Sequence, residues 1–252
     1  MIDVEQHGAV TELRLNRPPV NALNPQLVQA LDASLAEAVA GGARAVVLSG
    51  SERMFSAGLD VPTLLRLSRE EISAFWGDFL GLLRRLAECP VPLSAAITGH
   101  SPAGGAVLAL FCDHRVMSRG EFRIGLNEVQ VGLPVPDVIC HALVRLVGGG
   151  TANRMLAAGE LLLPEEAQRV GLVDHLADDG EATRQRALEW AGYVAEQPPV
   201  AVASTRRTVR SDLMGLFSDV DRETAEAISD VWFSKETQAA MHALVERLAA
   251  KH

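Results

Sequence analysis

Short apolar runs recur between helical runs along the first 180 residues, a pattern that is typical of an α/β fold although it contains no clear sequence repeat. Residues 43–50 and 91–99 have the apolar character of buried strands, and each run is closed by a glycine. Between them, residues 70–88 carry apolar side chains at helical spacing, and Pro90 ends this helix. We therefore expect buried strands that alternate with helices.

The remaining elements of this part of the chain continue the alternation. The sequence begins with two short extended runs joined by a His7-Gly8 turn, which predicts a hairpin. The expected elements are a hairpin over residues 2–15, a helix over 25–39, a helix over 105–112, a strand over 114–118 and an extended run over 121–128.

From residue 181 the character of the sequence changes to helix. Residues 181–197 form one helical run that Pro198 ends, and we expect two further helices between residues 201 and 251. We divide the chain into a core at residues 1–190 and a helical region at residues 191–252. The helical region is rich in apolar side chains, which indicates packing against another subunit or, with equal reason, against its own domain.

The composition excludes several classes of partner. The chain has 32 Asp and Glu against 23 Lys and Arg, a net charge of −9, which argues against nucleic acid or an anionic membrane as the main partner. No apolar run reaches the about 18 residues of a membrane span, and the acidic, strand-like N-terminus differs from a signal peptide. Cys89, Cys112 and Cys140 are odd in number and widely spaced, which indicates reduced thiols and no metal site. We predict a cytoplasmic protein.

The stretch GHSPAGGAVLALFCD, residues 99–113, raises the question of a serine nucleophile. A hydrolase turn uses the N–H of the residue after the serine, but that residue is Pro102, which has no N–H. We interpret Ser101 as a turn residue. Gly104 and Gly105 directly precede an apolar helix, so N–H groups there can hold an oxyanion. The alternative is a purely structural tight turn.

A second turn has the same design. MFSAGLDVPTL, residues 54–64, joins a strand end to Gly58 and then to Asp60. Two N–H groups from two such turns, converging on one point, form an oxyanion hole in which each donor contributes about 3 kcal/mol of transition-state stabilisation. Such a donor pair without a nucleophile implies enolate chemistry.

Glu128 is the candidate acid for that chemistry. It lies between apolar runs on both sides, in the stretch FRIGLNEVQVGLPVP, residues 122–136. In an apolar pocket, desolvation raises the pKa of a carboxyl group toward the range of a useful general base. A glutamate on a strand edge that faces solvent is the alternative.

Three stretches in this order and spacing resemble the crotonase (enoyl-CoA hydratase/isomerase) superfamily: FSAGLD, SPAGGAVLALFCDHRV and IGLNEVQVGLPVP. The resemblance covers almost the whole chain and is closest to the Δ3,Δ2-enoyl-CoA isomerases, which share the Pro-Ala-Gly-Gly turn and the Gly-Leu-Asn-Glu stretch. It implies a spiral of ββα units, a helical C-terminal trimerisation region, and a homotrimer or a dimer of trimers. The implied substrate is a coenzyme A thioester, with no further cofactor.

The resemblance also implies roles for individual residues. The oxyanion hole would be the N–H groups of Leu59 and Gly104, and Glu128 would be the catalytic base. Arg53 and Lys235 are candidates to hold the phosphates of coenzyme A, and a solvated surface charge is the alternative for each of them. The residues expected to bind the substrate are Asn21, Ala22, Leu23, Arg53, Ala57, Asp60, Gly105 and Lys235.

One departure from the family pattern distinguishes between activities. Hydratases of this superfamily carry a second glutamate at the position of Val107, and a valine cannot orient the water that hydration requires. The sequence therefore favours an isomerase that moves a 3-enoyl double bond to the 2-position. A hydratase or another crotonase reaction, and a non-catalytic acyl-CoA-binding protein, are the alternatives. Asp137 is expected to cap a helix that starts near Val138, because the second acid of dienoyl-CoA isomerases aligns with Pro136 instead.

Overall fold

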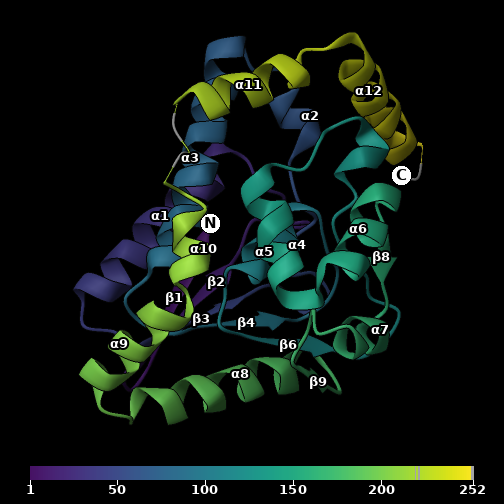
Figure 1. Cartoon of the computed structure of the whole chain (residues 1–252). Helices are drawn as coiled ribbons and strands as arrows, with labels where there is room; N and C mark the ends of the chain where they lie inside the picture. Colours follow the sequence, from purple (N-terminus) through teal and green to yellow (C-terminus); the bar gives the residue numbers. More distant parts are fainter. Residues whose placement is uncertain (219, 221, 251–252) are drawn as a thin grey trace.

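The chain folds around a six-stranded sheet (Figure 1). In spatial order its strands are β1 (Ile2–His7), β2 (Val10–Leu15), β3 (Ala45–Ser49), β4 (Leu93–Ile97), β6 (His114–Ser118) and β9 (His175–Ala177). The first two strands form the expected antiparallel hairpin, and the later strands all run parallel. The computed structural model describes residues 1–218, 220 and 222–250.

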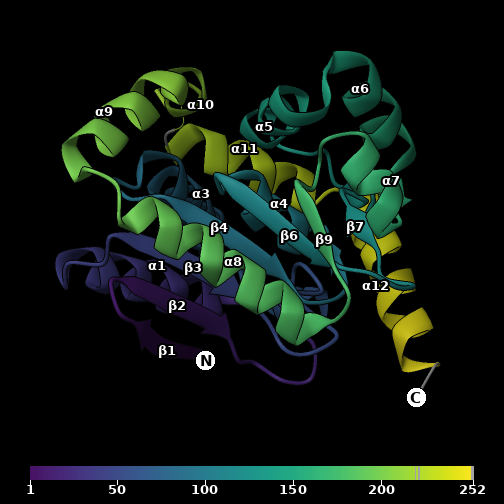
Figure 2. The same ribbon diagram turned by 90° about the horizontal axis from the view of Figure 1, so that it is seen from below.

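Helices cover both faces of this sheet. One face is covered by α8 (Gly180–Ala195), which crosses β3, β4 and β6, as Figure 2 shows. The opposite face is covered by α1 (Pro25–Ala40) and by α3 (Arg69–Glu88), which pack against each other. Both helices lie within a residue of the expected positions, because their apolar spacing and their caps at Asn24 and Ser68 are local features.

The strand β3 shows why the apolar runs of the sequence are uninterrupted. Ala45 and Val47 pack toward α8, whereas Val46 and Leu48 belong to the larger core on the other face. Successive side chains of a strand point to opposite faces, so a strand that is covered on both sides has no polar face.

A second sheet of two-residue strands brings two stretches of the chain together. β5 (Ser101–Pro102) pairs in parallel with β7 (Ile124–Gly125), which pairs in antiparallel fashion with β8 (Leu161–Leu162). β5 leads directly into α4 (Gly104–Leu110), and β7 is followed by the 3-10 helix η1 (Glu128–Val131). This sheet places the start of α4 against β7, which ends three residues before η1 begins.

Two predictions in this region are wrong. Of the extended run expected over residues 121–128, only Ile124 and Gly125 form a strand, and the backbone leaves the extended region at Asn127. Asp137 does not cap a helix, because it is itself the first residue of α5 (Asp137–Val147). Pro136 occupies the cap position and makes no side-chain hydrogen bond there.

In the part of the chain that the structure describes, four helices follow α8 where two were expected. The break after Val209 separates the first pair, and Ser234, in an extended conformation, ends the third helix and caps the fourth. The chain passes from α8 across α3 to the far side of the molecule (Figure 1). The expected domain boundary at residues 190/191 falls inside α8. The four helices are α9 (Pro199–Val209), α10 (Ser211–Gly215), α11 (Arg222–Trp232) and α12 (Lys235–Ala249).

The remaining helices of the described residues are short. They are α2 (Val61–Leu64), α6 (Gly149–Ala158) and α7 (Pro164–Arg169).

Throughout the described part of the chain, no helix combines the length and the apolar character that crossing a membrane requires.

Candidate active site

The N–H of Leu59 lies in a turn whose peptide orientation is fixed by hydrogen bonds. The Leu23 N–H donates to the Gly58 carbonyl at 2.7 Å, and the Asp60 N–H donates to the Leu23 carbonyl at 2.9 Å. Since the N–H and C=O of a trans peptide point in opposite directions, the Leu59 N–H points away from Leu23. Among the residues that the structure describes, this N–H has no hydrogen-bond partner.

The N–H of Gly104 is oriented in the same way at the start of α4. The carbonyl of Ala103 accepts a hydrogen bond from the Val107 N–H at 2.9 Å, so the Gly104 N–H points out of the helix start. Ala103 has φ 49° and ψ −124°, a conformation that non-glycine residues adopt only under strain. Its N–H is held at 2.8 Å by the Gly125 carbonyl. No partner of the Gly104 N–H occurs in the described part of the chain.

The two turns are in direct contact. A Cβ atom added to Gly58 would lie 3.1 Å from the Gly104 nitrogen and 2.8 Å from the Ala103 Cβ. A Cβ atom added to Gly105 would lie only 2.5 Å from the Ser56 carbonyl oxygen. Glycine is therefore required on both sides of the contact. The turns that carry the unpartnered N–H groups of Leu59 and Gly104 thus lie against each other, and the binding of one oxyanion by both groups stays a prediction.

Two buried polar residues support the first turn from behind. The Ser56 hydroxyl donates to the Asn21 carbonyl at 2.7 Å and accepts from the Gly58 N–H at 3.2 Å. Asn21 has φ 51°, and its side-chain amide donates to the Phe55 carbonyl at 3.1 Å. Asparagine tolerates this left-handed conformation better than most residues. The asparagine at position 21 was therefore the one signal in the sequence for the support of this turn. The role of Ser56 was not predicted.

Arg17, which was also not predicted, joins two of the expected binding residues. Its guanidinium donates to Asp60 at 2.6 Å and to the Ala22 carbonyl at 2.9 Å. The second oxygen of Asp60 accepts from the Thr63 N–H at 3.0 Å and so caps α2. Both oxygens of the Asp60 carboxylate are thus engaged within the protein, and this group stabilises the turn around Leu59.

Glu128 has the environment of a general base. It is 9% exposed, and its Oε2 atom is buried without a hydrogen-bond partner in the described structure. Burial raises the pKa of the Glu128 carboxyl to about 7, although a hydrogen bond to its own backbone opposes this. The solvent-facing alternative is therefore wrong. Glu128 lies three residues after Gly125. The Gly125 carbonyl accepts a hydrogen bond from the N–H of Ala103, the residue before Gly104.

The other predicted binding residues fall into two groups. The first group is buried behind or within the two turns, and the second is at least partly accessible. Arg53 is exposed and lies over the Phe122 ring at 5.3 Å, and Lys235 is exposed at the start of α12. The buried group is Asn21, Ala22, Leu23, Asp60 and Gly105, and the accessible group is Arg53, Ala57, Leu59 and Lys235.

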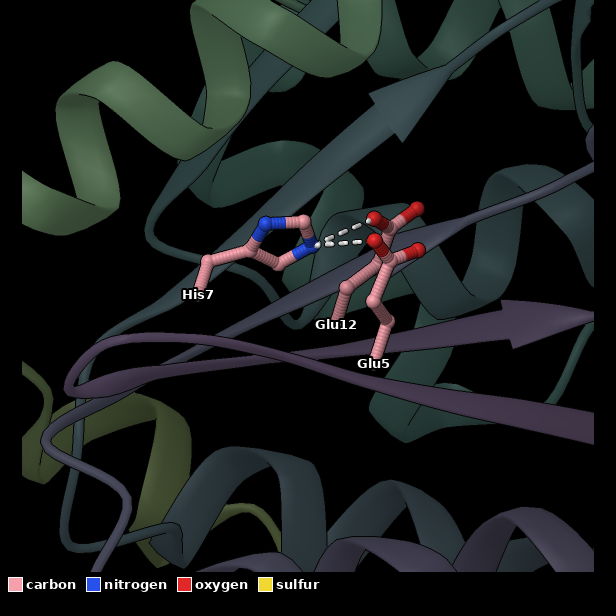
Figure 3. Close-up of side chains that lie close together, drawn as sticks. All are labelled: Glu5, His7 and Glu12. Carbon is pink, nitrogen blue, oxygen red and sulfur yellow. Dashed lines mark hydrogen bonds and ion pairs between the residues drawn. The ribbon is translucent and has the colours of Figure 1, made fainter.

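Glu5, His7 and Glu12 form a cluster on the hairpin that resembles a metal site in composition (Figure 3). Their ligand atoms lie within 4.8 Å of one another. The Glu12 carboxylate, however, already accepts hydrogen bonds from Arg184 at 2.9 and 2.8 Å and from the Ser49 hydroxyl. The Arg184 guanidinium supplies the positive charge there, and a cation would have to displace it.

Comparisons with known proteins agree with this fold. A family model described as enoyl-CoA hydratase/isomerase matches residues 5–252. The crystal structure of human mitochondrial Δ3-Δ2-enoyl-CoA isomerase superposes with a TM-score of 0.94 at 29% identity, covering 99% of this chain and 98% of that one. A mouse protein (Mus musculus), mitochondrial enoyl-CoA delta isomerase 1, is 29% identical over 100% of this chain and 88% of its own. A Thermus thermophilus protein with enoyl-CoA hydratase in its name is 38% identical over 82% of each chain.

Proposed function

The chain belongs to the enoyl-CoA hydratase/isomerase family, and from this membership we propose that it is a Δ3,Δ2-enoyl-CoA isomerase. Two observations carry the proposal: the buried Glu128 carboxyl has an oxygen without a hydrogen-bond partner in the described structure, and the Leu59 and Gly104 N–H groups lie unpartnered there in two turns that contact each other. Val107, at the position of the second glutamate of hydratases, is 1% exposed in α4. Moving a double bond needs one base that takes a proton and returns it, whereas adding water also needs a group that holds the water.

The reaction follows from this arrangement. A 3-enoyl thioester binds with its carbonyl oxygen between the N–H groups of Leu59 and Gly104. Glu128, as carboxylate, takes a proton from the carbon next to the carbonyl, and negative charge moves onto the thioester oxygen. The protonated Glu128 then returns the proton to the far end of the dienolate, which gives the conjugated 2-enoyl product.

The donors reduce the barrier because their orientation is set before the substrate arrives. Leu23 fixes the first peptide and the Val107 N–H fixes the second, so neither must reorganise during the reaction. Each such donor stabilises the developing oxyanion by about 3 kcal/mol. The raised pKa of Glu128 lies close to neutral pH, where a group is effective both as base and as acid.

A hydratase is the second candidate, because the Thermus thermophilus relative has enoyl-CoA hydratase in its name. Purified protein is given 3-enoyl-CoA or 2-enoyl-CoA, and the ultraviolet absorption of the conjugated thioester is followed. The isomerase makes absorption appear from the first substrate. A hydratase removes absorption from the second, and a non-catalytic acyl-CoA-binding protein changes neither; both results contradict the proposal.

The same family membership supports the remaining proposals. Arg53 and Lys235, both exposed, would hold phosphates of coenzyme A against the negative net charge of the chain. The helical C-terminal region would form a homotrimer or a dimer of trimers, which analytical ultracentrifugation measures. A cytoplasmic location also stays a prediction.

A further inference from the structure

The last helix of the fold contacts the segment that carries Glu128. Thr237, in the first turn of α12, is 1% exposed, and its hydroxyl donates to the Gly132 carbonyl at 2.6 Å. Gly132 directly follows η1, the 3-10 helix that Glu128 begins. The contact therefore joins residues that are far apart in the sequence at the end of the catalytic segment.

This contact is fixed from the α12 side. Ser234 caps the helix by accepting from the Thr237 N–H at 3.2 Å, and its hydroxyl donates to the Thr237 hydroxyl at 3.0 Å. The two hydroxyls and the Gly132 carbonyl thus form a chain of hydrogen bonds that polarise one another. The main chains also meet, since a Cβ atom added to Gly132 would lie 3.2 Å from the Thr237 Cα.

Gly132 and its neighbour are hydrogen-bonded to Glu128. The Gly132 N–H donates to the Glu128 carbonyl, and the Leu133 N–H donates to the same carbonyl at 3.1 Å. Within η1, the Gln130 side chain donates to the Gly159 carbonyl at 2.9 Å. A four-residue 3-10 helix has poor internal hydrogen-bond geometry, so these outside contacts are what hold η1 in place.

We propose that Thr237 is a positioning residue for proton transfer, whose hydroxyl bond to Gly132 holds Glu128 over the substrate. The inference rests on the proposed role of Glu128 as the base. Thr237 itself does not contact the reacting atoms. Its loss should therefore impair the chemical step and leave substrate binding nearly intact.

The test compares two substitutions of Thr237 in the full-length protein. Thr237→Val removes the hydroxyl and keeps the shape, and we expect kcat to fall about ten- to a hundredfold with KM nearly unchanged. Thr237→Ser keeps the hydroxyl and should restore most of kcat. Thr208→Val on α9 is the matched control and should match the wild type, because the Thr208 hydroxyl donates to the Ser204 carbonyl in its own helix.

Several results would overturn the proposal. These are a wild-type kcat in Thr237→Val, an equal loss in the valine and serine variants, or a rise in KM alone. If the valine variant does not fold, Thr237→Cys, of similar size and with a weak donor, takes its place, and an unchanged kcat there counts against the proposal.

A second readout separates this inference from the proposed reaction. Amide hydrogen exchange of Leu133 reports whether η1 is held, and it should become faster in Thr237→Val but not in Thr237→Ser. If the wild type does not isomerise 3-enoyl-CoA, the proposed function fails. The exchange measurement still decides whether Thr237 holds the segment, and unchanged exchange would refute that.

Discussion

The buried carboxyl of Glu128 makes folding sensitive to pH. Its pKa rises from the ordinary value of 4.5 to about 7 because burial disfavours the charged form. The folded protein therefore holds a proton there that the unfolded chain loses above pH 4.5. Between these two values stability decreases as pH rises, by a total on the order of 3 kcal/mol.

Catalytic activity should change with pH in the opposite direction to stability. Only the carboxylate form of Glu128 can take the proton, so kcat/KM for 3-enoyl-CoA should increase with pH and level off above a midpoint of about 7. Initial rates across the acid range measure this midpoint. A midpoint near 4.5 would mean that Glu128 is solvated in the working enzyme.

The Glu128→Gln variant separates activity from stability. We expect turnover to fall about a thousandfold, within the range that general-base catalysis contributes, while substrate binding is kept. The free energy of unfolding at pH 8, from urea titration, should be higher than in the wild type, and the difference should vanish near pH 4.5. Retention of the wild-type rate would refute the assignment of the base.

At the scale of elements, the contact between the two turns tolerates no added side chain. Gly105→Ala would bring a methyl group to 2.5 Å from the Ser56 carbonyl oxygen and separate the turns. We expect a loss of about a hundredfold in kcat/KM, because the two donors no longer converge. Rates and thermal unfolding together measure the effect, and an unchanged kcat/KM would contradict the geometry.

Gly81→Ala is the matched control. Gly81 lies inside α3, where an added Cβ atom meets nothing within 4 Å. The same chemical change should leave activity unaltered and stabilise the protein by up to about 1 kcal/mol, because alanine is the better helix former.

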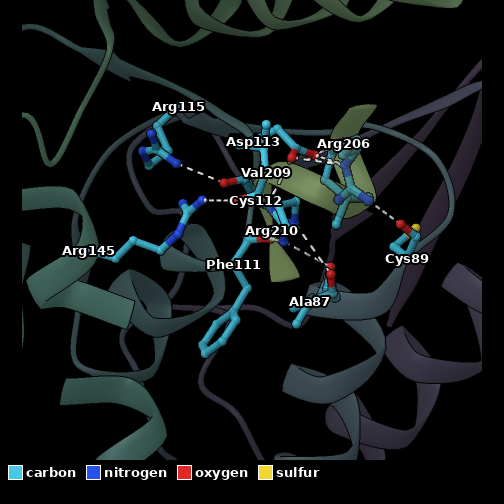
Figure 4. A network of polar contacts seen from close by, with 12 residues as sticks. Ala87, Cys89, Phe111, Cys112, Asp113, Arg115, Arg145, Arg206, Val209 and Arg210 are labelled. Carbon is cyan, nitrogen blue, oxygen red and sulfur yellow. Dashed lines mark hydrogen bonds and ion pairs between the residues drawn. The ribbon is translucent and has the colours of Figure 1, made fainter. Parts of the chain in front are cut away.

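At the scale of the whole molecule, a buried ionic network ties the C-terminal helices to the core (Figure 4). Arg206 lies in the last turn of α9, and Arg210 lies between α9 and α10. Both donate hydrogen bonds to the Asp113 carboxylate, Arg206 at 2.9 Å and Arg210 at 2.8 Å. Arg210 also donates to the Phe111 carbonyl at 2.8 Å, and Arg206 to the Cys89 carbonyl. A single acid thus compensates two largely buried cations.

Removal of that acid should destabilise the fold severely. Asp113→Asn leaves both arginines without a counter-charge, and we expect a loss of about 3 kcal/mol or more in the free energy of unfolding. Asp212→Asn breaks the exposed pair with Arg145 and should cost less than about 1 kcal/mol. Urea titration of both variants measures these free energies of unfolding, and equal losses in the two variants would show that the network contributes little.

Much of the fold was predictable because its signals are local. The hairpin, α1, α3 and the strands of the main sheet follow from apolar spacing and caps. The short strand β7 and the 3-10 helix at Glu128 do not, because they depend on pairing with β5 and contact with α12. The number of C-terminal helices also does not follow from local signals.

The candidate site was predictable to a similar extent. Glu128 and the two glycine turns lie in distinctive motifs, so the sequence singled them out, and their catalytic roles stay predictions. Each support of the site, Arg17, Ser56 and Thr237, bonds to at least one partner 35 or more residues away, and no local pattern indicates that partner. Ala103 carries no sign of its positive φ, which the surrounding hydrogen bonds impose.

The direct contact of Gly58 with Gly104 also restricts how this scaffold can diversify. An added Cβ atom at Gly58, Gly104 or Gly105 would clash across the contact, so side chains there cannot grow without separating the turns. On this framework, a change of reaction would have to come from surrounding positions such as 107 and 128. In the proposed reaction, the two turns that hold the thioester would then stay constant while the groups that direct the proton or the water are exchanged.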